Sequence, residues 1–254
     1  LAPDGDAVLD STGVLNLPEV PESLIIVGAG AIGLELGDFF GMMGSKITIV
    51  EAAPHIAPTE DADIAKEMDR VQSKAGRTCI TGVMAKSLVT KDGQAELTLG
   101  DGRVLTASKA LVAVGRTPNT AGLDCEKAGC TLKRRGFVDV NDHLEAAEGV
   151  YAIGDVNGRI QLAHAAEAQG LRAVNHILGK TDGIRLDVVP SAIFTYPEAA
   201  CVGPTEDQLK QSGAPYTVRK SFYRSNGKAV AMEETEGLLK LFVAEDGKLL
   251  GCHV

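Results

Sequence analysis

The amino-acid sequence predicts a protein of the α/β class, and three observations support this. Short apolar runs rich in β-branched residues, such as 24–27 and 47–50, have the length and character of buried strands. A stretch with apolar residues at helical spacing, 31–43, lies between them. Two Asp-Gly pairs, at 92–93 and 101–102, indicate hairpins that add a small antiparallel meander to the parallel pattern.

The first strand, helix and second strand carry a recognisable motif. The apolar run enters Gly28-x-Gly30-x-x-Gly33, a helix follows, and the second strand ends on Glu51. Gly28 permits a tight turn, Gly30 lets the backbone approach a pyrophosphate, and Gly33 lets helix and strand pack closely. The helix N-terminus offers N–H groups and partial positive charge to the phosphates. We therefore predict a dinucleotide site; the alternative is a glycine-rich turn in another kind of α/β protein.

The acid at the end of the second strand indicates which coenzyme is bound. A carboxylate at Glu51 can accept hydrogen bonds from the adenosine ribose hydroxyls and repels a 2′-phosphate. No Arg or Lys occurs among residues 52–55, which follow directly. NAD is therefore favoured over NADP, and the alternative is that Glu51 is a solvated acid at a strand end.

Composition limits the classes of function. The chain has 254 residues, 44% of them hydrophobic and 23% charged, as is typical of globular proteins. A net charge of −9 argues against a nucleic-acid partner, and no apolar run has transmembrane length. The five cysteines are odd in number and scattered, which suits a reducing compartment better than a disulfide scaffold. We predict no metal site and no membrane partner.

The remaining elements follow from periodicity and from turn residues. Residues 1–17 show little periodicity and are predicted to be a connector, and residues 205–208 form a capping-box pattern. Further helices are expected over 61–75 and 163–178. Strands are expected over 83–89, 95–99, 104–107, 110–114, 149–153, 188–202, 217–222, 229–233, 238–244 and 248–253.

Several segments, taken together and in order, resemble the flavin-dependent pyridine nucleotide–disulfide oxidoreductases, and most closely their dihydrolipoamide dehydrogenase branch. The resemblance covers essentially the whole chain. The segments that carry it are DSTGVL at 10–15, GAGAIGLELG at 28–37, VGRTPNT at 114–120, GVYAIGD at 149–155 and LAHAAE at 162–167.

The resemblance implies roles for individual residues. Gly28, Gly30, Gly33 and Glu51 would hold NAD, and Glu35 would lie near the nicotinamide and position it over the flavin. Gly115 would approach NAD through its backbone, and a residue near Met84 would touch the adenine. The residues implied in FAD binding are Asp155, at the ribitol hydroxyls, and Gln161, Leu162, Ala163 and His164, along the isoalloxazine edge. Fixed dipoles there would stabilise negative charge on the flavin. Glu35 could instead be a helix-surface acid.

Three parts of the family pattern are not found in the sequence. They are an N-terminal FAD half with its own glycine turn, a redox cysteine pair within that half, and a C-terminal His-Pro-x-x-x-Glu segment. Together with an apparent strand that stops at Val254, this predicts a fragment of a longer protein. Cys125 and Cys130 have the spacing of a redox pair, but they lie after the nucleotide-binding segment. A short helix over 123–128 would point them apart, so we favour coincidence.

The resemblance also predicts domains and activity. We expect a connector at 1–17, an NAD-binding domain with a Rossmann-like fold at 18–143, a FAD-domain segment at 144–183, and an incomplete α+β interface domain at 184–254. The parent enzyme would oxidise dihydrolipoamide with FAD and NAD. It would act as a homodimer with lipoyl-bearing subunits of 2-oxo acid dehydrogenase complexes, in the cytoplasm or, alternatively, the mitochondrial matrix. The fragment alone would bind NAD(H) without turnover. Alternatives are another disulfide reductase, a soluble transhydrogenase or a non-catalytic nucleotide-binding module.

Overall fold

The computed structural model describes all 254 residues, and they form two compact units. Unit 1 comprises residues 1–115 and 192–254, and unit 2 comprises residues 116–191. The boundaries at 143 and 183, which we expected between the NAD-binding, FAD-domain and interface segments, stay predictions. No helix of either unit combines the length and the apolar character needed to cross a bilayer.

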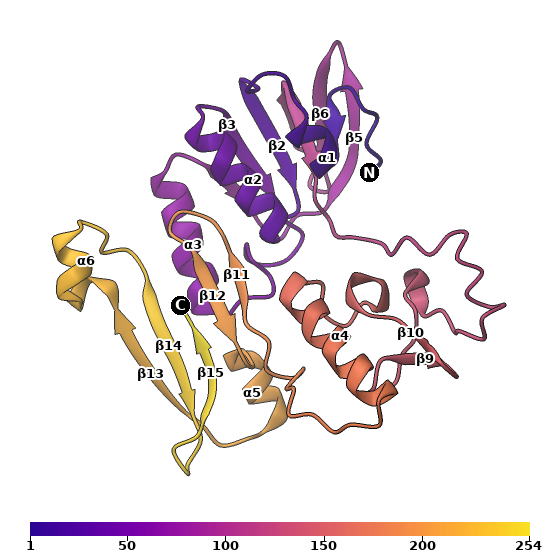
Figure 1. Cartoon of the computed structure of the whole chain (residues 1–254). Helices are drawn as coiled ribbons and strands as arrows, with labels where there is room; N and C mark the ends of the chain where they lie inside the picture. The colour runs from indigo at the N-terminus through magenta and orange to yellow at the C-terminus, as the bar shows by residue number, and fades with distance from the viewer. The chain divides into compact units, whose positions relative to one another are not determined.

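Unit 1 contains a five-stranded parallel sheet, and the chain folds it from segments separated by helices and by a meander (Figure 1). All four strand pairs of this sheet are parallel. In sheet order the strands are β1 (Val8–Leu9), β8 (Lys109–Val112), β2 (Ser23–Val27), β3 (Lys46–Val50) and β4 (Thr78–Ile80).

Leu24 to Val27 of the central strand β2 are buried, on both faces of the sheet, which explains why these four residues are all apolar. Leu24 and Ile26 pack into one hydrophobic cluster, while Ile25 and Val27 pack into a second cluster on the opposite face. Three helices and a three-stranded antiparallel meander belong to this part of unit 1. They are α1 (Ser11–Leu15), α2 (Ala31–Met42), α3 (Ala62–Lys74), β5 (Ala85–Lys91), β6 (Gln94–Leu99) and β7 (Val104–Ala107).

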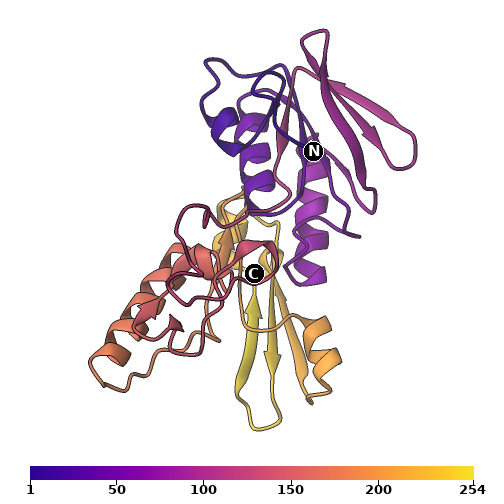
Figure 2. The same cartoon turned by 90° about the vertical axis from the view of Figure 1, so that its right-hand side faces the viewer.

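A second five-stranded sheet completes unit 1, and Figure 2 shows its β14 and β15, drawn in yellow, side by side. The pairs β12–β15, β14–β15 and β13–β14 are antiparallel. In sheet order the strands are β11 (Ser191–Ile193), β12 (Ala199–Val202), β15 (Leu249–His253), β14 (Leu238–Val243) and β13 (Thr217–Phe222). Helix α5 (Glu206–Ser212) starts at the predicted capping box of Thr205 and Gln208 and ends at Gly213, which has a left-handed conformation.

Unit 2 has little regular structure besides one long helix. Its elements are η1 (Arg134–Gly136), β9 (Glu145–Ala147), β10 (Val150–Tyr151), η2 (Gly154–Asn157) and α4 (Ala163–Ile177). A small cluster around Val138, Val140 and Leu144 forms its core. Gln169 of α4 is buried and accepts hydrogen bonds from the Gly154 N–H and the Asn157 amide, both at 2.8 Å, so α4 is fastened to η2.

Two local predictions are wrong, each for a local reason. Residues 229–233 are not a strand: Asn226 caps helix α6 (Gly227–Ala231), which follows η3 (Tyr223–Ser225), by accepting N–H bonds from two residues of its first turn. No helix spans 123–128, because Asp124 has a φ of +49° that an α-helix does not allow. Residues 1–17 include β1, which pairs with β8 at the sheet edge, and their role as a connector stays a prediction.

Two strand predictions were too long. The strand expected over 149–153 is only β10, because Gly149 has a φ of +71° and Gly154 already begins η2. The segment 188–202 is two strands, β11 and β12, separated by the turn that Pro197 indicated. A strand of two or three residues is too short for its periodicity to be recognised in the sequence.

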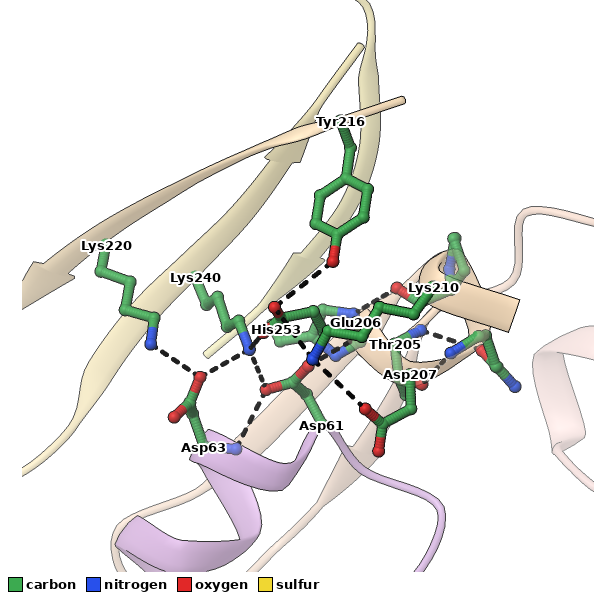
Figure 3. Close-up of polar contacts among 12 residues, drawn as sticks. Asp61, Asp63, Thr205, Glu206, Asp207, Lys210, Tyr216, Lys220, Lys240 and His253 are labelled. Carbon is green, nitrogen blue, oxygen red and sulfur yellow. Dashed lines mark hydrogen bonds and ion pairs between the residues drawn. The ribbon is translucent and has the colours of Figure 1, made fainter. Parts of the chain in front are cut away.

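A charged side chain, the Lys240 ammonium on β14, is buried in unit 1 (Figure 3). The side chain is 1% exposed, and its Nζ lies 2.7 Å from Asp61 Oδ1, 2.5 Å from Asp63 Oδ2 and 2.6 Å from Glu206 Oε2. Burial disfavours the charged form of Lys240, but the three carboxylates outweigh it and raise its pKa. Burial likewise tends to raise the pKa of Asp61, yet the bond from Lys240 and backbone N–H groups lower it. This network ties the start of α3 to the second sheet.

We expect the substitution Lys240→Met to lower the free energy of unfolding by about 3–5 kcal/mol, because it leaves three carboxylates close together without their shared cation. Urea unfolding followed by circular dichroism measures the change. The matched control is Lys210→Met, which removes an exposed ion pair to the same Glu206 and should cost less than about 1 kcal/mol. Equal effects of the two substitutions would contradict the assignment of Lys240 as the centre of the network.

Candidate nucleotide-binding site

The turn between β2 and α2 is built so tightly that two of its glycines have no room for a side chain. Gly28 has a φ of +105°, and a Cβ there would lie 2.4 Å from the carbonyl oxygen of Ala113. A Cβ on Gly33 would lie 2.0 Å from the carbonyl oxygen of Gly28. These contacts correspond to the tight turn and the close helix–strand packing that the motif predicts.

Gly30 differs from these two glycines, since a Cβ there would meet nothing within 4 Å. It is the N-cap residue of α2, its backbone is extended (φ −76°, ψ −177°), and no side chain caps the helix. The N–H groups of the first turn therefore lack an intrahelical acceptor and are free to bind an anion. The open space at Gly30 is a cradle that a side chain would fill.

Glu51 follows β3 and is fixed by backbone donors. Its Oε2 accepts the N–H of Ala29, in the glycine turn, at 2.7 Å, and its Oε1 accepts the N–H of Ala53 at 2.8 Å. A carboxylate has about four acceptor positions, so both oxygens can accept further hydrogen bonds. The glycine turn and the acid are thus held in one arrangement by a direct bond.

A cavity of about 440 Å³ opens at the carboxyl ends of β2, β3 and β8. Ligands of open α/β sheets bind at this edge. Five of the residues predicted from the sequence line the cavity, and they are Gly28, Gly30, Glu51, Met84 and Gly115. The other lining residues, which present mainly backbone and short apolar side chains, were not predicted from the sequence: Leu1, Val27, Val50, Ala52, Pro58, Val83, Ala85, Ala113 and Val114. Their position just after a strand was the signal that could have found Ala113 and Val114.

Glu35 does not line this cavity, and neither does Gly33. Glu35 lies on α2, and its Oε1 accepts the backbone N–H of Phe194 at 2.9 Å. The carboxylate therefore fastens α2 to the segment after β11. Its predicted place beside a nicotinamide stays a prediction.

A larger cavity of about 550 Å³ lies elsewhere in unit 1 and is lined by residues of α3, of the segment 195–199, and of α6 with its flanking segments. None of the predicted site residues lines it. It has no uncapped helix N-terminus and no glycine turn of the predicted kind, so size alone does not make it the better candidate.

The residues that the resemblance assigns to FAD all belong to unit 2. Leu162 is the N-cap residue of α4, and Ala163 begins the helix. No side chain caps the N-terminus of α4, and its first turn contains no acidic residue. His164 is exposed, and its Nε2 lies 2.7 Å from the carbonyl oxygen of Pro190, which can only accept, so Nε2 donates. Asp155, in η2, is about half exposed and lies 3.8 Å from the Arg116 guanidinium.

Uncapped N–H groups at the start of α4, with the exposed Gln161 beside them, suit a ligand that carries partial negative charge. The electron-rich edge of a flavin is such a ligand. An exposed Asp155 can accept hydrogen bonds from hydroxyl groups. The residues present therefore fit the predicted group, and their roles in binding it stay predictions.

No thiol of unit 2 forms a disulfide. Cys125 and Cys130 lie in a turn, where the Cys130 N–H donates to the Cys125 carbonyl at 2.9 Å, and both pack into the small core of the unit. In unit 1, burial raises the pKa of the Cys79 thiol to about 12, and the nearby Asp69 carboxylate adds to the shift. Cys79 is therefore a packing residue, because only a thiolate reacts.

Comparisons with known proteins match the whole chain. The profile of the family described as pyridine nucleotide-disulphide oxidoreductase matches residues 2–170, and the dimerisation domain of that family matches residues 189–254. The chain is 41% identical over 258 residues to dihydrolipoyl dehydrogenase 1, mitochondrial, of Arabidopsis thaliana, which covers 99% of this chain and 51% of that protein. It is 38% identical over 265 residues to dihydrolipoyl dehydrogenase of Trypanosoma brucei brucei, covering 99% and 54%. The chain thus spans about half the length of the curated relatives it matches.

Two solved structures are also similar to this chain. LpdA from Mycobacterium tuberculosis superposes with a TM-score of 0.91 at 32% identity, covering 99% of this chain and 56% of that one. The HOCl-induced flavoprotein disulfide reductase RclA from Escherichia coli superposes with a TM-score of 0.88 at 33% identity, covering 100% and 58%. These findings confirm the resemblance and the fold class that the sequence predicts.

Substitutions at two glycines test whether each position has room for a side chain. Gly33→Ala places a methyl group against the Gly28 carbonyl, so we expect it to cost at least about 2 kcal/mol of folding free energy. Gly30→Ser meets no atom and introduces a favourable N-cap residue, so we expect a change of less than about 0.5 kcal/mol. Thermal and urea unfolding provide the measurement. A destabilisation by Gly30→Ser as large as that by Gly33→Ala would contradict the difference in available space between the two positions.

Proposed function

The chain belongs to the pyridine nucleotide-disulphide oxidoreductase family, and on that premise we propose that it binds NAD(H) at the turn between β2 and α2 and serves the NAD- and FAD-dependent oxidation of dihydrolipoamide. One observation carries the nucleotide part of the proposal. The cavity at the carboxyl ends of the strands is lined by Gly30 at an uncapped helix N-terminus and by Glu51, the acid of the adjacent strand.

The pyrophosphate and the ribose of the coenzyme need different binding groups, and the site has one for each. The free N–H groups of α2 beside Gly30 bind the pyrophosphate, since no side chain occupies the space that it needs. Glu51 accepts the ribose hydroxyls and repels a 2′-phosphate, which favours NAD over NADP. The exposed Met84 side chain contacts the adenine, and the backbone at Gly115 closes the cavity.

Glu35 is proposed to position the nicotinamide. Its Oε1 is anchored by the Phe194 N–H, and its second oxygen can accept an amide hydrogen. This role rests on the family resemblance rather than on the cavity.

Unit 2 is proposed to contribute to an FAD site. Asp155 accepts hydroxyl hydrogen bonds, and the start of α4 at Gln161, Leu162, Ala163 and His164 presents N–H groups to an electron-rich ring edge. Bound FAD supplies two-electron redox chemistry between thiols and a nicotinamide. The overall reaction balances as dihydrolipoamide plus NAD⁺ giving lipoamide, NADH and a proton.

The choice of substrate rests on the names of relatives. Proteins called dihydrolipoyl dehydrogenase are 36–41% identical to this chain in the Arabidopsis and Pseudomonas putida examples. A second candidate is the reduction of another disulfide, which is favoured by the likeness to a flavoprotein disulfide reductase at 33% identity. A third is nucleotide binding without catalysis. Assays of the purified chain with dihydrolipoamide and NAD⁺, and with NADH and oxidised disulfides, distinguish the three.

A homodimer and lipoyl-bearing subunits are the proposed partners. The match of residues 189–254 to the family's dimerisation domain supports the homodimer. Lipoyl-bearing subunits are the substrate carriers that dihydrolipoamide chemistry requires. Two plant relatives are named as mitochondrial, so the matrix is a compartment to test beside the cytoplasm.

We expect NADH to bind at least about tenfold more tightly than NADPH, because the Glu51 carboxylate and a 2′-phosphate repel each other. Titration of coenzyme fluorescence against the purified chain at low salt gives both dissociation constants. Tighter binding of NADPH would overturn the role of Glu51.

The substitution Gly30→Ser should weaken NADH binding by at least about tenfold, because the new hydroxyl takes up the open space and competes for N–H groups of α2. The matched control is Gly183→Ser, in unit 2, where a Cβ also meets nothing within 4 Å. Unchanged NADH affinity in a folded Gly30→Ser variant would show that the pyrophosphate does not bind at this turn.

A further inference from the structure

We propose that Glu60, Cys201 and His253 form a binding site for a divalent transition metal, with Zn²⁺ as the ion that their chemistry suits best. A carboxylate oxygen of Glu60, the sulfur of Cys201 and a ring nitrogen of His253 all lie within 4.8 Å of one another. These residues are far apart in the sequence, which is why the sequence predicts no metal site. The proposal is independent of NAD(H) binding.

The fold of the second sheet explains how two of the ligands meet. Cys201 on β12 and His253 on β15 are directly opposite each other in an antiparallel pair, so both side chains project from the same face. Glu60 comes from the loop that ends at Asp61, the N-cap residue of α3. Because α3 packs on this side of the second sheet, the loop brings Glu60 to the pair.

Two of the three ligands carry buried atoms without a partner. Glu60 is 6% exposed and His253 is fully buried, and neither Glu60 Oε2 nor His253 Nδ1 has a hydrogen-bond partner. A buried carboxylate oxygen that lacks a partner is costly, and so is a buried ring nitrogen. A cation between them would satisfy both.

The protonation of His253 already suits a metal ligand. Its Nε2 lies 2.9 Å from the carbonyl oxygen of Pro204, and since a carbonyl only accepts, Nε2 carries the hydrogen. A neutral imidazole then has its lone pair on Nδ1. Metal-bound histidines commonly donate their other N–H to a carbonyl or carboxylate in this way, which fixes the ring. The Phe242 ring, edge-on at 5.5 Å, covers His253 on one side.

The set of donors indicates the ion. Zn²⁺ binds thiolate, imidazole and carboxylate with bonds of about 2.0–2.3 Å, which places neighbouring ligand atoms about 3–4 Å apart. Small side-chain rotations bring the three atoms onto one ion, and a fourth position is left for water. Binding displaces the thiol proton, so Zn²⁺ and the Cys201 thiol give a zinc thiolate and one released proton.

The positive charge of Lys240 does not oppose a cation at this site. Lys240 is the partner of His253 across the β14–β15 pair. Its ammonium is bound by three carboxylates, Asp61, Asp63 and Glu206, and Lys220 and Lys210 also pair with Asp63 and Glu206 (Figure 3). The positive charges of this network are therefore compensated by carboxylates.

Metal binding by the purified chain tests the proposal. The chain is stripped with EDTA, dialysed and titrated with Zn²⁺ against a chromophoric chelator, and Co²⁺ is added in a parallel experiment. We expect one equivalent of tightly bound Zn²⁺, and a near-ultraviolet sulfur-to-cobalt charge-transfer band that reports the thiolate ligand. Failure of the wild-type chain to bind an equivalent of Zn²⁺ overturns the proposal, whatever its affinity for NADH.

Variants assign the ligands. Cys201→Ala should abolish the charge-transfer band, and Glu60→Gln should weaken Zn²⁺ binding by about 100-fold while keeping the side-chain shape. The matched control is Cys252→Ala, because Cys252 neighbours His253 on β15 and points to the opposite face of the sheet. Near-ultraviolet circular dichroism confirms that each variant is folded. Binding that persists unchanged in folded Cys201→Ala and Glu60→Gln shows an ion held elsewhere and contradicts the site.

Discussion

The geometry of the turn between β2 and α2 depends on the close contact between the Gly33 backbone and the Gly28 carbonyl. No side chain fits between them, so the start of α2 lies directly against the end of β2. That closeness aims the first free N–H groups of the helix at the edge of the sheet, beside Glu51. The carboxylate in turn accepts the Ala29 N–H of the same turn. The helix N–H groups and the carboxylate, which we propose to bind a pyrophosphate and a ribose, are therefore positioned by one short segment of backbone.

The loop that precedes α3 connects this turn to the second sheet. The Ala57 N–H donates to the Ala29 carbonyl at 2.9 Å, and the Ala57 side chain is buried in the core below. A few residues further on, Asp61 both caps α3 and binds the Lys240 ammonium. The segment 57–61 thus contacts the glycine turn at one end and the second sheet at the other. Any ion held at Glu60 would brace the same segment.

Short-range patterns explain what the sequence could predict. The glycine turn, the capping box of Thr205 and the hairpins at Asp92-Gly93 and Asp246-Gly247 each depend on residues within a few positions, and all of them formed as expected. The errors also had local causes, because one residue in a left-handed conformation, such as Asp124, removes a helix that propensity allows. Strands as short as β1 form by pairing with a neighbour, which periodicity in a single sequence does not reveal.

Polar contacts between residues far apart in the chain could not be predicted from the sequence. Lys240 binds carboxylates 34 and 179 positions away, and Glu35 reaches the Phe194 N–H across 159 positions, so no local pattern of charge marks either as buried or paired. His253 is predictable as a strand residue, yet its importance comes from facing Cys201 and Glu60. A site in which a short stretch of backbone provides the binding groups can be recognised from a local sequence motif. Sites assembled from side chains on separate elements appear only once the sheets and helices have been placed.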